Sequence, residues 1–202
     1  MTTVVITGGG TSGHVLPAIA IAEMLEDRGV SASDIHIIGT VRGVDGQILG
    51  DTEYPHTLLP VTGLARSLRP RALFGNLASA ARLVAARRRC RALLADLRPD
   101  IVVSVGGYGS LAAMHAARRL GIRTVVVSYD SRPGLATRRQ AKHADTVTVA
   151  DPTSPLENAI LTGAPVRRAV RGLDRPTARI RARALLGLPA DGFVVEIGRA
   201  HV

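Results

Sequence analysis

Short apolar runs alternate with longer stretches of helical periodicity, and this alternation restricts the possible fold more than any other feature. Six runs rich in Val, Ile, Leu and Thr have the length and composition of buried strands. They are residues 3–7, 35–38, 57–61, 101–105, 124–127 and 146–149. Strands that alternate with helices predict an α/β fold with a parallel, doubly wound, Rossmann-like sheet.

Helices are predicted where apolar residues recur at three- and four-residue spacing. These stretches are residues 16–28, 73–97, 111–120 and 134–143. In a parallel sheet the carboxyl ends of the strands share one edge, and open sheets of this kind bind ligands there. We therefore expect the loops that follow the strands to carry the functional residues.

A glycine-rich loop, GGGTSGH at 8–14, follows the first predicted strand and precedes a helix start marked by Pro17. Glycines let the backbone approach a ligand closely, and the N–H groups of a helix start favour a phosphate or diphosphate. The loop also satisfies the G-x-G-x-x-G pattern of nicotinamide enzymes, but the next predicted strand ends IIGT at 37–40 without the acidic residue that binds a ribose hydroxyl. A turn that serves only packing is the alternative to a phosphate site.

A second glycine loop, GGYGS at 106–110, follows a fully apolar predicted strand. It belongs to a weak internal repeat, in which VVITGG at 4–9 resembles VVSVGG at 102–107. We expect both loops to face one cleft, where the hydroxyl of Tyr108 would face a sugar or phosphate. A packing role is the alternative for Tyr108.

Charge and composition narrow the class of partner. The chain has 26 basic and 16 acidic residues, for a net charge of +10, which favours nucleic acid, a phosphorylated ligand or an acidic membrane surface. Aromatic residues form only 2% of the chain, and we find neither a zinc-finger spacing nor an RNA-recognition signature, so we expect no nucleic-acid partner. One cysteine excludes an intramolecular disulfide. We expect no signal peptide, membrane span, metal or cofactor, and a cytosolic location with at most peripheral membrane contact.

Four motifs occur in a fixed order: GGTSGHVLP at 9–17, GGY at 106–108, PGL at 133–135 and GAPVR at 163–167. In this combination the chain resembles the MurG family, the peripheral membrane N-acetylglucosaminyltransferases of peptidoglycan synthesis. The resemblance covers residues 1 to about 195. It implies a GT-B fold of two Rossmann-like domains, and inverting transfer from UDP-N-acetylglucosamine to lipid I, an undecaprenyl-diphosphate-linked acceptor, to give lipid II.

The resemblance also implies roles for single residues. His14 would be the general base that deprotonates the acceptor hydroxyl, since a near-neutral pKa suits that proton transfer. A local hydrogen bond at the helix start is the alternative role for His14. The residues implied to bind substrate are Thr11, Ser12, Gly13, Gly107, Tyr108, Asp130 and Arg167.

Two of these residues lie outside the glycine loops. Arg167 would contact the donor across the cleft, and a solvated arginine is the alternative. Asp130 ends the sequence VSYD at 127–130, where the family usually has His-Glu-Gln-Asn, and it replaces an asparagine that contacts the donor. Because a carboxylate is repelled by a diphosphate, we expect Asp130 to bond sugar hydroxyls instead.

A basic and apolar segment at residues 65–74 leads into the longest predicted helix, which carries RRRCR at 87–91. Apolar side chains ringed by arginines suit contact with anionic lipid, and the resemblance implies membrane contact in this region. The alternative is an ordinary amphipathic helix with a solvated basic face.

The character of the sequence changes after Arg167, where a polar stretch, a basic helix and a predicted strand at 193–195 follow one another. We expect an acceptor-binding domain at 1–167, and at 168–195 a linker and the start of a donor-binding domain that is otherwise missing. Residues 196–202 can be back-translated in frame to the start of a common sequencing adapter, so we expect an artefact there. We expect the fragment alone to be inactive. Two alternatives are another GT-B glycosyltransferase with a lipid or natural-product acceptor, and a noncatalytic nucleotide-binding module.

Overall fold

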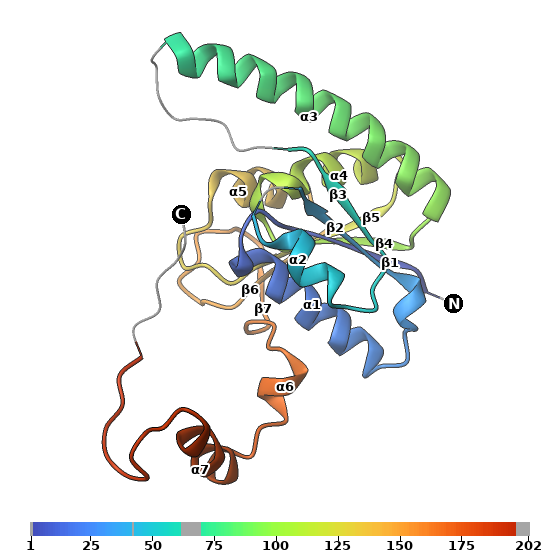
Figure 1. Ribbon diagram of the computed structural model, residues 1–202. Coiled ribbons are helices and arrows are strands. Elements are labelled where there is room, and N and C mark those ends of the chain that lie inside the picture. Colours follow the sequence, from blue (N-terminus) through green and yellow to red (C-terminus); the bar gives the residue numbers. More distant parts are fainter. Residues whose placement is uncertain (1, 42, 62–69, 197–202) are drawn as a thin grey trace. The chain divides into compact units, whose positions relative to one another are not determined.

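The computed structural model describes residues 2–41, 43–61 and 70–196, with the backbone alone for 70–82. In this part of the chain seven parallel strands form one sheet in the order β3-β2-β1-β4-β5-β6-β7 (Figure 1). The strands are β1 (Val4–Thr7), β2 (Ile35–Thr40), β3 (His56–Leu59), β4 (Ile101–Ser104), β5 (Arg123–Ser128), β6 (Thr146–Val149) and β7 (Ile160–Leu161). The prediction of a parallel, doubly wound α/β sheet is confirmed, and β7 adds a short edge strand to the six that were predicted.

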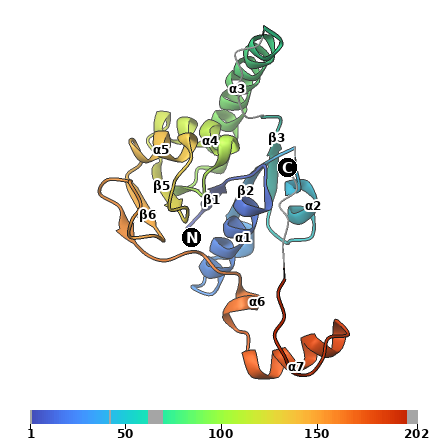
Figure 2. The ribbon, with the colours of Figure 1, turned by 90° about the vertical axis from the view of Figure 1, so that its left-hand side faces the viewer.

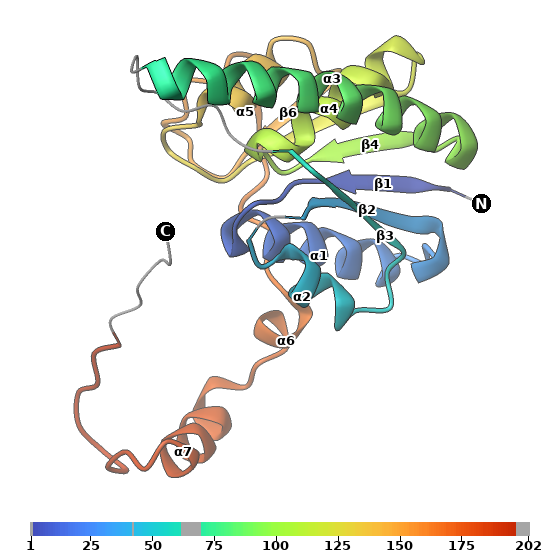
Figure 3. The same ribbon diagram turned by 45° about the horizontal axis from the view of Figure 1, so that its top comes forward.

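Helices cover both faces of this sheet. On one face lie α1 (Ser12–Glu26) and α2 (Asp45–Gly50), and on the other lie α3 (Pro70–Leu97), α4 (Gly107–Arg119) and α5 (Leu135–Ala141) (Figure 3). Figure 2 shows the same separation from another side, with β1 and β2 between the two sets of helices. A short 3-10 helix, η1 (Ala32–Asp34), leads into β2.

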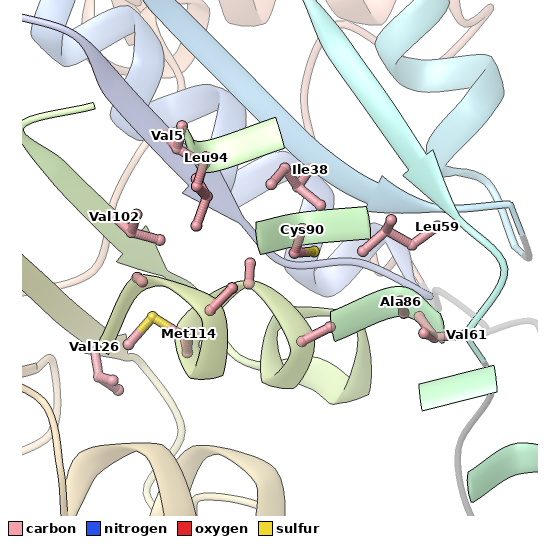
Figure 4. Packing of buried hydrophobic residues seen from close by; sticks show 14 residues of the cluster. Val5, Ile38, Leu59, Val61, Ala86, Cys90, Leu94, Val102, Met114 and Val126 are labelled. Atoms are coloured by element: carbon pink, nitrogen blue, oxygen red, sulfur yellow. The ribbon is translucent and has the colours of Figure 1, made fainter. Parts of the chain in front are cut away.

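Side chains that alternate along β1 enter two separate cores. Val5 belongs to the core formed with α3 and α4, which also contains Cys90, Leu94 and Met114 (Figure 4). Ile6 packs on the opposite face against α1. Because helices bury both faces, the strands are continuous apolar runs, and these runs made them predictable from sequence. Burial raises the pKa of the Cys90 thiol to about 12, which leaves that thiol unreactive at neutral pH.

Two helices begin earlier than the sequence predicts. α1 starts at Ser12 rather than at residue 16, so Pro17 lies inside the helix and does not mark its start. α4 starts at Gly107 rather than at residue 111, so most of the second predicted loop forms the first turn of a helix. Glycine and serine have low helix propensity and add nothing to apolar periodicity, which explains both errors. The short helix α2 was not predicted.

The chain divides into two compact units, residues 1–168 and 169–202, with α6 (Arg168–Arg171) at the division. The first unit contains the whole sheet. The second contains α7 (Arg175–Leu185), the predicted basic helix, and Arg183 in its last turn donates hydrogen bonds to the carbonyls of Pro189 and Gly192. The strand predicted at 193–195 is wrong: the backbone has no ladder partner there, and Phe193 is 94% exposed.

Two sequence predictions fall partly or wholly outside the described residues. They are the lipid-contact segment at 65–74, of which only the backbone from Pro70 onward is described, and all but the first residue of the suspected artefact at 196–202. None of the helices in the described ranges combines the length and apolarity needed to cross a bilayer.

Candidate functional site

The two glycine turns begin side by side, because β1 and β4 are neighbouring parallel strands in which Thr7 pairs with Ser104. The turns then touch. A Cβ atom built on Gly8 would lie 2.2 Å from Cγ2 of Val105, and one built on Gly107 would lie 2.8 Å from the carbonyl oxygen of Gly9. The structure therefore brings the two predicted glycine loops together at the carboxyl edge of the sheet.

The second turn requires glycine for its backbone conformation as well as for space. Gly106 and Gly107 have φ angles of 92° and 81°, in the left-handed region that side chains disfavour. A side chain on Gly106 would also meet Oγ1 of Thr137 at 2.9 Å and the ring of His14 at 3.4 Å. The absence of a side chain at Gly106 thus leaves room for the His14 ring against this turn.

His14 stands in the first turn of α1 between the two glycine turns. Its Nδ1 atom lies 2.9 Å from Oγ1 of Thr11. When Nδ1–H donates this bond, Nε2 is free to act as a base on the side of the second turn. Burial lowers the pKa of His14, and the negative charges of Asp130 and Asp45 oppose that shift. The imidazole is therefore neutral at pH 7, the state in which it can take up a proton.

A buried carboxylate that the sequence analysis missed supports the first turn. The Asp45 side chain accepts hydrogen bonds from the N–H of Gly10, at 2.9 and 3.1 Å, and from the N–H of Thr40 at 2.8 Å. Asp45 is fully buried at the start of α2. The N–H of Gly10 thus serves the fold and is not available to a phosphate. In the first turn of α1 the N–H of His14 donates to the carbonyl oxygen of Thr11 at 3.0 Å, whereas helix geometry leaves the N–H groups of Ser12 and Gly13 without an intrahelical partner.

A tyrosine that was also missed ties the two turns together from a third strand. Tyr129 follows β5, and its hydroxyl lies 2.5 Å from the carbonyl oxygen of Gly13 and 3.2 Å from that of Val105. Burial raises the pKa of this hydroxyl, which keeps it protonated as a donor. Asp130 comes next in the chain and is exposed. Its negative charge acts to raise the pKa of His14, against the effect of burial.

Most of the sequence-predicted site residues gather at this edge. Thr11, Ser12 and Gly13 are exposed at the start of α1, and the half-buried Tyr108 follows Gly107 in the first turn of α4.

Arg167 lies elsewhere. Its Nε atom donates to the carboxylate of Glu23 at 2.8 Å, and Glu23 is nine residues beyond His14 along α1, about 13 Å at 1.5 Å per residue. The structure thus separates Arg167 from the glycine turns.

A cavity of about 880 Å³ occupies the opposite edge of the sheet. It lies at the amino ends of β6 and β7, and its lining includes Arg138, Lys142 and Glu157. Because all the strands are parallel, this cavity is remote from the turns at the carboxyl edge. Within the described ranges, no three His, Cys, Asp or Glu side chains are grouped as a metal site would require.

Known proteins resemble this chain in sequence. The profile of the glycosyltransferase family 28 N-terminal domain matches residues 4–149. A protein of a Nocardioides species is 42% identical over 188 residues, which are 93% of this chain and 50% of the relative. A protein of Acidothermus cellulolyticus is 39% identical over 194 residues, 96% of this chain and 51% of the relative. Both are named UDP-N-acetylglucosamine--N-acetylmuramyl-(pentapeptide) pyrophosphoryl-undecaprenol N-acetylglucosamine transferase.

Solved structures resemble the chain in fold. MurG of Acinetobacter baumannii matches 83% of this chain and 47% of its own, with a TM-score of 0.65 and 24% identity. A UDP-GlcNAc 2-epimerase of Methanocaldococcus jannaschii matches 81% of this chain and 46% of its own, with a TM-score of 0.56 and 15% identity. The chain spans about half the length of the curated relatives it matches. Because the family profile covers more than half of the chain, the chain belongs to glycosyltransferase family 28, whose N-terminal domain it carries.

Proposed function

We propose that the chain is the acceptor-binding half of a hexosyltransferase that transfers N-acetylglucosamine from UDP-N-acetylglucosamine to lipid I, giving lipid II in peptidoglycan synthesis. The observation that carries the proposal is the meeting of two helix starts, those of α1 and α4, with His14 between them. The names of the relatives supply the donor and the acceptor.

The two helix starts suit a diphosphate. Each presents free N–H groups and the positive end of a helix dipole at the carboxyl edge of the sheet. The acceptor diphosphate would bind there, near Ser12, Gly13 and Gly107. The muramoyl hydroxyl would then lie near the imidazole of His14.

The chemical step is a direct displacement. The muramoyl oxygen forms a bond to the anomeric carbon of the donor while the bond from that carbon to the diphosphate breaks, and UDP leaves with the electron pair. Nε2 of His14 takes the hydroxyl proton during the attack. The neutral state of His14 at pH 7 supports this role.

The donor would come from the half of the relatives that this chain does not span. We propose that residues 168–195 are the linker and the start of that second domain, after an acceptor domain at 1–167. The exposed apolar side chains of α7, Ile180 at 75% and Leu185 at 77%, suit a helix that packs on further chain. A contact between Arg167 and the donor would require its ion pair with Glu23 to open.

We also propose that the protein binds the cytoplasmic side of the cell membrane peripherally, where the lipid acceptor lies. The exposed arginines of α3, among them Arg88, Arg89 and Arg91, would face anionic lipid. The net charge of +10 supports this attraction.

The proposal is tested in a chimera of residues 1–167 with the C-terminal half of the Nocardioides relative. We expect transfer of N-acetylglucosamine to a short-chain lipid I analogue, and a fall in kcat of about 10²- to 10⁴-fold for His14→Ala with little change in KM for the acceptor. His115→Ala, an exposed histidine on α4, is the matched control. A chimera that binds the analogue without transfer would favour the binding module, and transfer to other acceptors only would favour another GT-B enzyme.

A further inference from the structure

Buried hydrogen bonds around Gln140 support the Gly106–Gly107 turn from below. Gln140 lies on α5 and is 6% exposed. Its Oε1 accepts from the hydroxyl of Ser104 at 2.5 Å, and its Nε2 donates to the hydroxyl of Ser110 at 2.7 Å. Gln140 therefore joins the last residue of β4 to the first turn of α4.

Both serines also form hydrogen bonds with the backbone of the glycine turn. The hydroxyl of Ser104 accepts from the N–H of Gly106 at 3.2 Å, and the hydroxyl of Ser110 donates to the carbonyl oxygen of Gly107 at 2.7 Å. In these four hydrogen bonds each serine hydroxyl donates once and accepts once, so all donor and acceptor roles are compatible. With the amide reversed, the Ser110 hydroxyl would have to donate to Gln140 and would lose the Gly107 carbonyl. In this orientation the Gln140 amide is linked to the N–H of Gly106 through the Ser104 hydroxyl, and to the carbonyl of Gly107 through the Ser110 hydroxyl.

The turn held in this way is the one that touches His14. A Cβ on Gly106 would lie 3.4 Å from both Cδ2 and Nε2 of the imidazole, and one on Gly107 would lie 3.6 Å from Cδ2. A rotation of the turn would therefore change the surface against which the imidazole is packed. It would also change the direction of the first N–H groups of α4.

We propose that Gln140 is a positioning residue, which acts through Ser104 and Ser110 to hold the Gly106–Gly107 turn in the orientation that seats His14 and directs the start of α4. Its effect on ligand binding rests on the proposed function, whereas its effect on His14 does not. The buried amide satisfies the polar groups under the turn, a role that an apolar side chain cannot take.

The test uses the 202-residue chain with Gln140→Leu, which nearly keeps the volume and removes both bonds. The ring signals of His14 are followed by NMR against pH, and the affinity for inorganic pyrophosphate is measured by calorimetry. We expect the pKa of His14 to rise toward its ordinary value as water reaches the ring, and the pyrophosphate affinity to fall about tenfold through misdirected N–H groups.

A matched control separates positioning from general loosening. Thr124→Val removes another buried hydroxyl, which bonds Asp145 at 2.7 Å at the opposite edge of the sheet. This control should leave both readouts as in the wild type. If it shifts the His14 signals as far as Gln140→Leu does, or if neither variant shifts them, the positioning role is refuted.

A second variant allows for poor folding. Combining Ser104→Ala and Ser110→Ala with Gln140→Leu removes the two hydroxyls that lose Gln140 as a partner, but the N–H of Gly106 then loses its acceptor, so stability should recover only in part. The shifted pKa of His14 should persist, and its return to the wild-type value would overturn the proposal. If the wild-type chain itself fails to bind pyrophosphate, the proposed function loses support, while the His14 titration still decides the role of Gln140.

Discussion

The carbonyl oxygen of Gly9 lies so close to the backbone of Gly107 that a Cβ on Gly107 would be 2.8 Å from it. These residues are far apart in sequence but follow neighbouring strands. The contact makes the two turns one structural element, and any side chain at Gly107 must separate them.

Gly107→Ala should therefore cost more stability than its backbone conformation alone explains. The φ angle of 81° costs about 1 kcal/mol for alanine, and the clash with the backbone adds about 1–3 kcal/mol. Gly121→Ala isolates the first contribution, since Gly121 has a φ of 69° with open space around it. Urea unfolding of both variants measures the difference. Equal losses would show that the turns can separate freely.

Asp45→Asn should loosen the first turn. The carboxylate accepts bonds from Gly10 and Thr40, whereas an asparagine presents an N–H₂ group to one of these donors. We expect a loss of about 2–4 kcal/mol in the free energy of unfolding, because a buried donor is left unpaired. Asp51→Asn, an exposed position just after α2, is the control and should change stability by less than about 0.5 kcal/mol. A small loss for Asp45→Asn would mean that the turn does not depend on this carboxylate.

The pKa of His14 predicts how stability depends on pH. Because burial lowers this pKa in the folded state, the unfolded chain binds the proton more tightly. Stability is therefore greatest above the unfolded pKa of about 6.5 and falls as the pH drops through the folded value, by up to about 1.4 kcal/mol per pH unit.

His14→Gln should flatten this dependence. Unfolding in urea at several pH values between 7.5 and 5 measures it for both proteins. His36, whose pKa burial also lowers, keeps a residual slope in the variant. An unchanged slope in the variant would mean that His14 is solvated like an ordinary surface histidine.

Glu23 should protect the chain from trypsin after Arg167 and Arg168. Its carboxylate accepts from the Nε of Arg167 and from the backbone N–H of Arg168, whose guanidinium also bonds Glu26 and Asp27. Glu23→Gln removes the charge, so we expect cleavage at these two sites to rise about tenfold through local opening.

Mass spectrometry of timed digests measures this cleavage. Cleavage after Arg183 in α7 serves as the internal reference, because that side chain bonds Pro189 and Gly192. Glu53→Gln, at an exposed loop position, is the control variant. The predicted protection is contradicted if all three proteins are cut after Arg167 at the same rate.

The sheet could be predicted from the sequence because each strand has a local pattern that identifies it. Each strand is an apolar run whose neighbours bury both faces, and each glycine loop follows such a run, so the edge that carries the site could be inferred from order alone. The same reasoning failed at 193–195. An apolar run there has the composition of a strand, but a strand also needs a pairing partner, and the run itself does not reveal one.

The polar contacts that shape the site could not be predicted. Asp45 and Gly10 are 35 residues apart, Gln140 and Ser104 are 36 apart, and Arg167 and Glu23 are 144 apart. A single acidic or amide residue in a loop or helix carries no signal of its partner. These pairs form because the tertiary structure brings distant segments together, and local sequence patterns do not specify that arrangement.

The hydroxyl of Tyr129 has a consequence for how a ligand would be received. Because it donates to the carbonyls of Gly13 and Val105, it joins the end of β5 to the start of α1 and to the end of β4. Because these segments are already ordered before a ligand binds, they lose little conformational entropy on binding. An anion would therefore bind without a large cost for ordering the site. The two glycine turns would thus form a preorganised site, and large motions on binding would be confined to other regions of the protein.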